Sequence, residues 1–447
     1  MGRHAAIAAL LAGAAATVAA PTARADDAAL TAILAKVDAA AKEVSKIRGL
    51  PLKKPVATEI LDRDELRARV VAQLSDARSQ AQLAATGLVL ARLGEIPPGT
   101  DYQALLVDLL TEQIAGFYDP ATKKLALSRA ANLDDANWAD MVLAHELDHA
   151  LQDQSFDLHK LFDLPPGDGD ASAARHALVE GDGFATMIEV ALAHKGATVD
   201  WSNAEVATVI DKMMEQGAAG CAPHDTSCTA SAFDRAPLAV REALIFPYRA
   251  GFKLVAALRH RQAWSAVDAA FRRPPRSTEQ VIHPERYLAG DEPVAVQLDR
   301  PPSLQDWGVG ASLVWGEQAF DVFLRAHGVD AAVAAEAAAG WGGDRVLVLT
   351  KPSDATPDSA CAIARMDWDS EADAIEAAEA ATRAVDDLVV GATIERDQAR
   401  TRWLGLDGTV SWVERKGPSL VMVVGAPAAL ADSLATEVWA LAKTKKK

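Results

Sequence analysis

One stretch constrains this chain more than any other: His145-Glu146-Leu147-Asp148-His149. Residues four apart lie on the same face of a helix, so His145 and His149 can hold one metal ion together. Glu146, the residue after His145, can then reach a water on that ion and take its proton. The alternative is that both histidines are structural residues on a core helix. The stretch therefore predicts either a metal-bearing helix with its own base or a core helix with two packed rings.

The surrounding residues favour a helix over Trp138–Gln154. Leucines recur at every fourth position from Leu143 to Leu151 and form an apolar ridge. Asp134 or Asp135 can cap the first turn by accepting backbone hydrogen bonds. We therefore expect one long helix to carry the whole motif.

Length and charge narrow the classes of protein to consider. With 447 residues, the chain is long enough for two or three domains. Its formal net charge is −17 at pH 7, and the acidic residues are spread along the chain. This balance argues against nucleic acid as a partner.

Residues 1–25 are typical of an export signal. Arg3 supplies a positive start, Ala5–Ala20 is an alanine-rich apolar run, and Ala23-Arg24-Ala25 fits an A-x-A cleavage site. The apolar run is too short and too rich in alanine to favour a membrane span, and no later stretch is apolar for long enough. We therefore expect a soluble protein that starts at Asp26 and acts in the periplasm or outside the cell.

The chain has three cysteines. Cys221 and Cys228 are separated by the turn-prone run Ala-Pro-His-Asp-Thr-Ser, so they can close a small disulfide in an oxidising compartment. Cys361 has no evident partner. We expect it to be a free, buried thiol.

A third metal ligand must come from elsewhere in the chain. Zinc accepts histidine nitrogen and carboxylate oxygen, and a catalytic zinc site keeps three protein ligands plus a water. The metzincin class requires Gly and His three and six residues after the second histidine, where this chain has Gln152 and Ser155. That class is therefore excluded. The remaining candidates are His159, Asp168, Asp170, His176 and Glu180.

Among these candidates we prefer Glu180. It lies among apolar residues on a second predicted helix, over about Ala171–His194, and a carboxylate on such a face needs a partner. Gly181 and Gly183 each cost a helix about 1 kcal/mol relative to alanine, which indicates that another backbone packs very close. The metal helix lying there would explain both features. His176, one turn before Glu180, is the second choice, and we expect it to hydrogen-bond a ligand.

Four motifs carry a resemblance to a known family: Gly116-Phe-Tyr-Asp-Pro120, His145-Glu-Leu-Asp-His-Ala-Leu-Gln-Asp-Gln154, Leu178-Val-Glu-Gly-Asp-Gly183 and Ser277-Thr-Glu-Gln-Val-Ile-His-Pro284. On these motifs the chain resembles the gluzincin superfamily of zinc metallopeptidases, also called peptidase MA-like, and more narrowly a group of secreted bacterial proteins. The resemblance covers about residues 108–290.

The resemblance implies a zinc ion on His145, His149 and Glu180, with Glu146 as general base and acid in peptide hydrolysis. The position four residues after the glutamate is Phe184, where the best-known gluzincins have an aspartate. A carboxylate that supports a ligand must therefore come from another position. Asp182 and Asp153 are the candidates.

The predicted fold class is α+β, with a mainly helical zincin-like core, a small edge sheet and a C-terminal α+β domain. After the signal, we expect an N-terminal helical region over residues 26–100 and a zinc metallopeptidase-like domain over residues 101–345. The edge sheet would be a hairpin before the metal helix, where an extended peptide can pair, or an ordinary hairpin over the core. Residues 346–447 alternate short strands with helices, and their role is not legible from sequence.

The predicted function is an exported zinc metallopeptidase that acts on a peptide or protein substrate. Two other classes stay open. The protein can be a zinc-bearing binding or assembly protein without turnover, or a hydrolase of a non-peptide amide such as one in the cell wall.

Hydrolysis at zinc places negative charge on the carbonyl oxygen, which a second donor can stabilise. The candidates are His283, Tyr248 and Tyr118, and each can instead be a structural ring with a satisfied polar tip. We favour His283, because its polar, proline-bounded segment gives a titratable ring little reason to be there for packing. Tyr248 is the second choice.

Overall fold

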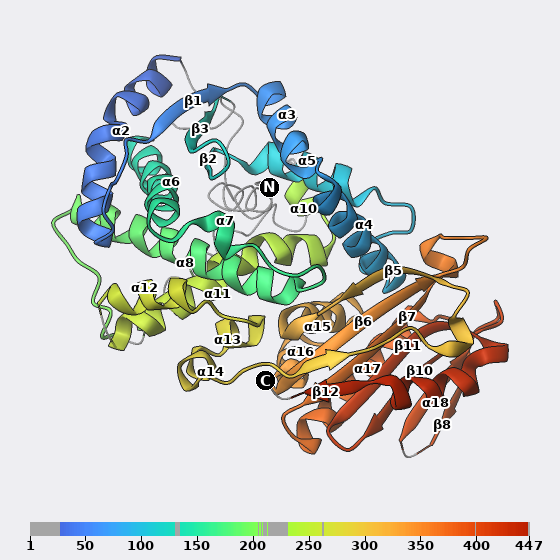
Figure 1. The fold of residues 1–447 in the computed structure, drawn as a ribbon. Helices are drawn as coiled ribbons and strands as arrows, with labels where there is room; N and C mark the ends of the chain where they lie inside the picture. The colour runs from blue at the N-terminus through green and yellow to red at the C-terminus, as the bar shows by residue number, and fades with distance from the viewer. Residues whose placement is uncertain are drawn as a thin grey trace, which may run out of the picture.

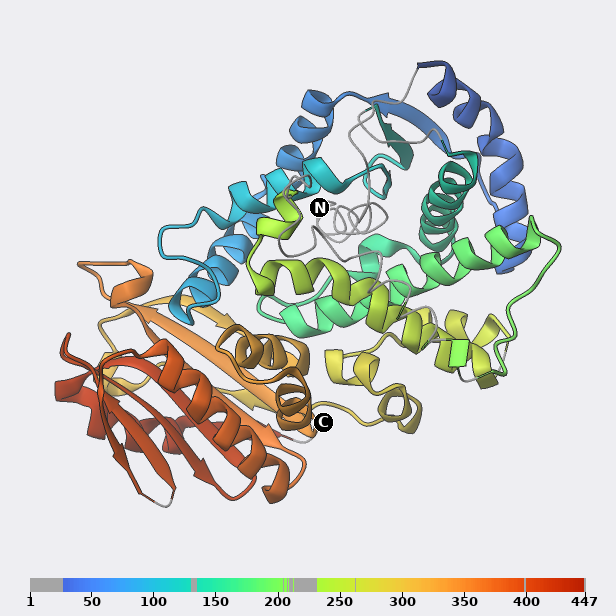
Figure 2. The same cartoon turned by 180° about the vertical axis from the view of Figure 1, so that it is seen from behind.

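The computed structural model describes residues 27–445, with the exception of residues 130–134, 204, 207, 209–211, 213–230, 262 and 398. The expected export signal and the expected Cys221–Cys228 disulfide lie outside the described residues. The fold is α+β, as predicted. It has a helical part, residues 27–290, and beside it a C-terminal domain, residues 306–445, built on one large sheet (Figures 1 and 2).

Long helices dominate the helical part. They are α2 (Asp27–Arg48), α6 (Ala136–Phe156), α8 (Gly169–Ala193) and α11 (Leu238–Arg261). Helix α8 lies between α6 and α11 and contacts both, while α2 packs across α6 and α8 (Figure 1). The helix expected from the metal motif is therefore α6, and the helix expected to carry Glu180 is α8.

A three-stranded sheet packs beside α6. Its order is β1-β3-β2, with β1 (Ala57–Leu61) parallel to β3 (Lys124–Ser128) and β2 (Gly116–Asp119) antiparallel to β3. The expected hairpin is thus present, and β2 forms an edge of the sheet next to the metal helix. Strand β1 comes from the expected N-terminal region. That region is therefore built into the helical part and does not form a separate layer.

After β1, the expected N-terminal helical region contains two helices, α3 (Arg63–Leu74) and α4 (Ala77–Arg92). The break occurs because Asp76 caps α4, its carboxylate accepting the backbone N–H groups of Arg78 and Ser79. Helix α5 (Tyr102–Gln113) follows and packs on both.

Shorter helices complete the helical part. They are α7 (Leu158–Leu161), α10 (Ala232–Arg235), α12 (Ser265–Arg272), α13 (Thr278–Ile282) and α14 (Pro284–Ala289). Helix α13 contacts α8 and α11 on one side and the C-terminal domain on the other. The segment that follows α14 contains β4 (Ala295–Gln297), which pairs with β12 (Lys443–Lys445) at the end of the chain.

The C-terminal domain contains a seven-stranded antiparallel sheet of order β5-β6-β7-β11-β10-β9-β8. The strands are β5 (Gly308–Leu313), β6 (Trp341–Thr350), β7 (Cys361–Trp368), β8 (Thr393–Arg396), β9 (Arg400–Leu404), β10 (Thr409–Lys416) and β11 (Ser419–Pro427). Helices α15 (Gly316–Ala326), α16 (Ala331–Ala338) and α17 (Glu371–Leu388) cover one face, and α18 (Ala431–Leu441) covers the other.

Strand β6 shows why this sheet has two cores. Successive side chains of a strand point to opposite faces. Val346 and Val348 accordingly join the core under α15–α17, while Leu347 and Leu349 join the core under α18. Both faces are buried here, so the run Val346–Leu349 is apolar without interruption. Cys361 on β7 is a free, buried thiol, as predicted.

The expected domain boundary at residue 346 is wrong, because it falls inside β6. The domain also includes β5, α15 and α16, which precede that strand. Strand β5 contains Gly308 and Gly310 and is largely exposed, so its sequence lacks the alternation that would have indicated a strand. No described helix has both the length and the apolar character that a bilayer crossing requires.

Candidate metal centre

Helix α6 presents the motif as its sequence predicts. Its first turn is capped by Asp135, which accepts the backbone N–H groups of Asn137 and Trp138 at 2.8 and 3.1 Å. The leucine ridge is buried in the core shared with α2. With that side of the helix occupied, His145 and His149 face α8.

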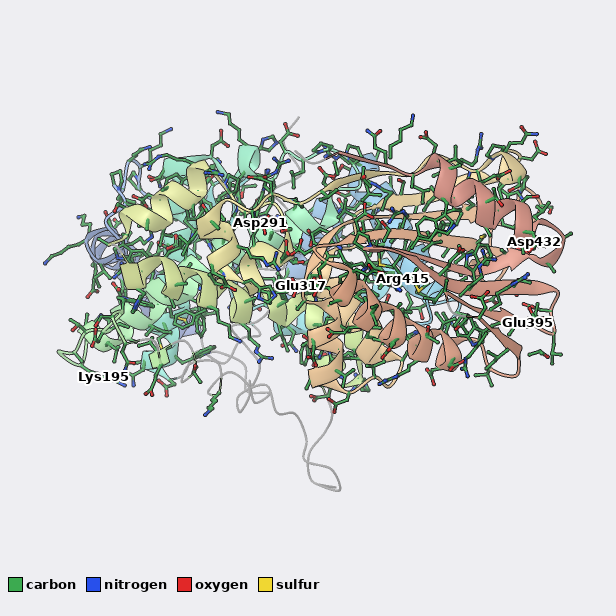
Figure 3. The ribbon with its side chains drawn as sticks, turned by 90° about the horizontal axis from the view of Figure 1, so that it is seen from below. Lys195, Asp291, Glu317, Glu395, Arg415 and Asp432 are labelled. Carbon is green, nitrogen blue, oxygen red and sulfur yellow. The ribbon has the colours of Figure 1, made fainter. Side chains whose placement is uncertain are left out.

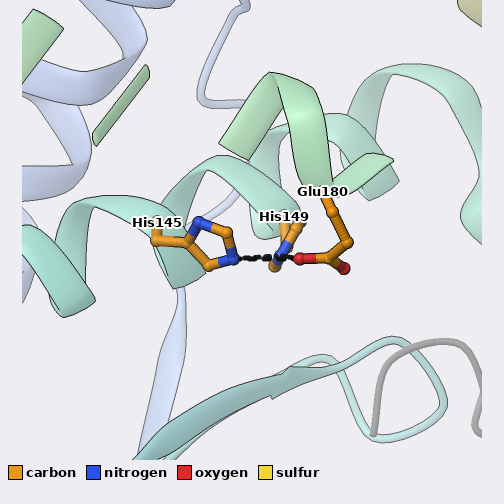
Figure 4. Close-up of side chains that lie close together, drawn as sticks. All are labelled: His145, His149 and Glu180. Carbon is orange, nitrogen blue, oxygen red and sulfur yellow. Dashed lines mark hydrogen bonds and ion pairs between the residues drawn. The ribbon is translucent and has the colours of Figure 1, made fainter. Parts of the chain in front are cut away.

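The two imidazoles meet the carboxylate of Glu180 (Figure 4). His145 Nε2 lies 3.0 Å from His149 Nε2 and 3.2 Å from Glu180 Oε2, and His149 Nε2 lies 3.6 Å from the same oxygen. Two ligands at about 2.0–2.1 Å from a tetrahedral zinc ion are separated by roughly 3.3 Å. The three donor atoms therefore stand at the spacing of a zinc site, before any rearrangement.

Glu180 is ionised despite its complete burial. Burial alone would raise its pKa, but His149, His145 and His176 outweigh that effect and hold the pKa well below the usual value. Its second oxygen, Oε1, lies 3.3 Å from His176 Nε2. His176 therefore contacts the far side of the carboxylate and is not one of the three grouped ligands, as expected.

The remaining candidates for the third ligand do not join this group. His159 lies on α7, and Asp168 stands at the N-cap position of α8. Asp170, in the first turn of α8, accepts hydrogen bonds from Thr278.

The tautomer of His149 follows from its neighbour Gln152. The amide nitrogen of Gln152, which has two N–H donors, lies within hydrogen-bond distance of three oxygens: Asp148 Oδ2 at 2.8 Å, Asp182 Oδ2 at 3.0 Å and the Val179 carbonyl at 3.1 Å. All three partners are acceptors, so the amide oxygen must face His149 Nδ1, which lies 2.9 Å away. His149 then carries a proton on Nδ1, which leaves Nε2 as the nitrogen that can bind a metal.

The glycines of α8 serve two different contacts. A Cβ at Gly183 would lie 2.9 Å from His145 Cε1 and 3.1 Å from His149 Cε1, so only glycine leaves room for both rings. A Cβ at Gly181 would collide with the backbone of Gly251 on α11. The expectation that α6 explains both glycines is therefore half wrong, because Gly181 belongs to the α8–α11 contact.

Glu146 lies beside the three grouped side chains. Its Oε2 accepts the backbone N–H of Tyr118 on edge strand β2 at 2.8 Å. Its Oε1 is buried and has no hydrogen-bond partner among the described residues. Burial raises the pKa of Glu146 above the ordinary value, towards the range useful for proton transfer at neutral pH.

Tyr248 on α11 also reaches the centre. Its ring lies 6.0 Å from the His145 ring, centroid to centroid, in a stacked orientation with an interplanar angle of 23°. The side chain is buried. Tyr248 therefore packs against His145 from the side that α11 lines.

His283, our first choice for the oxyanion donor, is wrong for this role in the structure. Its Nε2 lies 2.8 Å from Glu317 Oε1 on α15, a bond that raises the pKa of His283. Its segment is anchored by Thr278 to Asp170, ten residues before Glu180 and so roughly 15 Å away along α8. The polar character of this segment serves the domain junction.

Two further expectations also change. Tyr118 donates its hydroxyl to Asp153 at 2.8 Å, so only its backbone reaches Glu146. Asp153 binds Tyr118 and Lys123 and does not support a metal ligand. Asp182 does support one, but through Gln152. Sequence reasoning missed Gln152, whose signal was its position three residues after His149, where a helix places neighbours.

Comparison with known proteins adds one finding. A domain of unknown function (DUF8575) matches residues 306–435. This range begins just before β5 and ends within α18, in agreement with the domain boundary seen in the structure. The match leaves the metal centre outside. No curated protein and no solved structure matches the chain.

Proposed function

We propose that this protein is a zinc-dependent metallopeptidase. One arrangement supports the proposal above all: three donor atoms stand at zinc spacing, and Glu146 lies beside them with no hydrogen-bond partner at Oε1 among the described residues. A structural zinc site would use four protein ligands, whereas three come together among the described residues. A zinc ion held by these three residues would keep a fourth position for a catalytic water.

The chain's own residues divide the chemistry as follows. Bound at His145, His149 and Glu180, zinc would lower the pKa of a water and polarise the scissile carbonyl. Glu146 Oε1 takes the proton of that water, while Oε2 stays anchored to Tyr118 N–H. The same carboxyl then returns the proton to the leaving amine. Tyr248 donates its hydroxyl to the carbonyl oxygen as negative charge develops there.

Edge strand β2 supports a peptide as the substrate. Its neighbour on one side is β3, and its backbone also contacts the base through Tyr118. An extended peptide paired along this edge would lie beside Glu146. With the expected export signal, the enzyme would meet its substrate in the periplasm or outside the cell.

One observation favours a second candidate, a zinc-bearing binding protein without turnover. The ligands and the base are nearly inaccessible, with exposures of 1 % for His145, 3 % for His149 and 0 % for Glu146 and Glu180. A substrate would need an opening to reach them. A hydrolase of a cell-wall amide is the third class, and it would use the same residues.

The test compares three proteins for zinc content and for cleavage of casein, a peptide library and cell-wall material. Wild type should carry one zinc per chain and cleave peptide bonds. Glu146→Gln should keep the zinc and lose about 10²–10⁴ in turnover, because the general base is removed. Glu43→Gln, a half-exposed glutamate on α2 that pairs with His194, is the matched control and should be unchanged.

Each alternative has its own outcome. Zinc in both variants with no cleavage of any substrate favours the binding protein, and cleavage of cell-wall material alone favours the third class. Full peptidase activity in Glu146→Gln contradicts the proposed mechanism. Wild type without bound zinc contradicts the metal centre itself.

A further inference from the structure

Arg48 is a fully buried charge at the end of α2, in a region where the sequence indicated no chemistry. A buried guanidinium requires anionic partners. Its Nε donates to Asp182 Oδ1 at 2.6 Å, and its Nη1 donates to Asp268 Oδ1 at 2.9 Å. The guanidinium also lies over the ring of Trp264, 4.4 Å from the centroid. These contacts tie the first helix of the structure to α8 and α12.

Asp182 connects Arg48 to the metal centre through hydrogen bonds. While Oδ1 accepts from Arg48, Oδ2 accepts from the amide nitrogen of Gln152 at 3.0 Å. The amide oxygen of Gln152 in turn accepts the Nδ1 proton of His149 at 2.9 Å. An unbroken row of hydrogen bonds therefore runs from Arg48 to a metal ligand, and every donor and acceptor in it is assigned.

We infer that Arg48 is a positioning residue for His149, acting through Asp182 and Gln152; this inference rests on the proposed metal centre. Arg48 fixes which way the Asp182 carboxylate faces. Asp182, together with Asp148 and the Val179 carbonyl, fixes the amide orientation of Gln152. Gln152 in turn fixes the Nδ1 proton and the ring angle of His149. Partners of this kind typically change metal affinity by 10–100-fold.

Helix α2 therefore supports the metal centre through Arg48. Arg48 and Asp182 are 134 residues apart in the chain, so the row exists only when α2 is docked. Metal loading and docking of the N-terminal helix should therefore be coupled.

Zinc affinity, measured by competition with a chromophoric chelator, tests the row directly. Gln152→Met and Arg48→Met keep side-chain length but remove the acceptor and the charge, and each should weaken zinc binding by about 10–100-fold. The double variant should bind zinc no more weakly than Gln152→Met alone, because both residues act on one path.

Arg259→Met is the matched control. Arg259 lies over the same Trp264 ring, 3.9 Å from the centroid, but its hydrogen bond goes to Glu189 at 2.7 Å. It should change zinc affinity by less than about twofold, even if it destabilises the fold.

Asp182→Asn is the second variant, in case Arg48→Met does not fold. Both oxygens of Asp182 accept from donors, so an asparagine must oppose either Arg48 or Gln152 with its amide nitrogen. Zinc binding should weaken as in Gln152→Met. Zinc-loaded protein gives a further signature by ¹H NMR: the His149 Nδ1 proton, which Gln152 accepts, should give a downfield resonance in wild type and a shifted one in the variants.

The outcomes separate this inference from the proposed function. Wild type that fails to bind zinc removes the metal centre and leaves nothing to position. Wild type that binds zinc, with Asp182→Asn and Arg48→Met as tight as Arg259→Met and with an unchanged His149 Nδ1 proton resonance, overturns the role of Arg48 alone.

Discussion

Helix α8 carries two buried carboxylates with opposite behaviour, Asp170 in its first turn and Glu180 near its middle. Glu180 and Asp170 are 0 % and 3 % exposed, so burial disfavours the charge of both. The pKa of Glu180 is nevertheless well below its ordinary value, because three histidines surround it. Burial raises the pKa of Asp170 to about 8, with Asp344 and Glu317 adding to the rise. Neighbours, and not burial, decide which carboxylate can hold a cation.

The Asp170 end is a joint between the two parts of the molecule. Its Oδ1 accepts the backbone and side-chain donors of Thr278 at 3.0 and 2.5 Å. Gly316, at φ +84°, packs so close that a Cβ there would collide with the Asp170 carboxyl. Glu317 lies where the helical part meets the C-terminal domain (Figure 3). Acidic residues here connect elements of the two parts, whereas Glu180, near the middle of α8, faces histidines.

The largest effect is expected at Glu180, the carboxylate that faces the histidines. Glu180→Gln removes the anionic ligand, so zinc content should fall from about one per chain towards zero, a greater loss than that caused by any supporting residue. Elemental analysis after dialysis measures it. His176→Ala, which removes only the contact to Glu180 Oε1, should still bind zinc. An empty site in His176→Ala together with a full site in Glu180→Gln would reverse the ligand assignment.

The next effect concerns the ring beside His145. Tyr248→Phe should lower turnover by about 10²–10³, because a donor to the developing oxyanion is lost while the packing surface is kept. Zinc content and melting temperature should stay as in wild type. Steady-state kinetics on a cleavable peptide measure the change, and unaltered turnover would exclude Tyr248 as the donor.

The raised pKa of Asp170 predicts that the stability of the folded protein depends on pH. Its folded pKa of about 8 exceeds the ordinary value of 3.8, so between these values the folded state retains a proton that the unfolded state has released. Stability from this group is therefore full below about pH 4 and falls as pH rises to about 8, by at most about 1.4 kcal/mol per pH unit.

Asp170→Asn keeps an acceptor for Thr278 and cannot ionise. Its melting temperature should therefore fall less steeply than that of wild type between pH 5 and pH 8. Burial also raises the pKa of Asp344 and of Glu317, so part of the slope should remain. Equal slopes in the two proteins would show that Asp170 has an ordinary pKa. The contrast between Asp170 and Glu180 would then disappear.

The smallest effect is expected at His283. His283→Ala should change turnover by less than about twofold, because the imidazole is engaged with Glu317 at the domain junction. Loss of this partly exposed pair should cost about 1 kcal/mol of stability. Thermal unfolding and peptide cleavage, measured together, test both statements. A hundredfold loss of turnover with an unchanged melting temperature would return the oxyanion role to His283.

Features that depend on neighbours along the chain were determined by the sequence alone. The pairing of His145 with His149 follows from helical spacing, and Asp135 caps that helix through its own first turn. The approximate bounds of α8 and the strands of the C-terminal domain after β5 follow in the same way from periodicity. Glu180 was also predicted, because a lone acid on an apolar helix face requires a partner.

Only the tertiary structure decided which distant residues meet. His283 and Tyr248 were comparable candidates by sequence, and packing placed one at the domain junction and the other on His145. Arg48 reaches Asp182 because α2 crosses α8, a contact for which the local sequence of α2 gives no sign. Hydrogen bonds within a helix repeat at fixed spacing, whereas contacts between elements depend on how their buried faces fit. That fit is a property of the whole folded chain and not of any one segment.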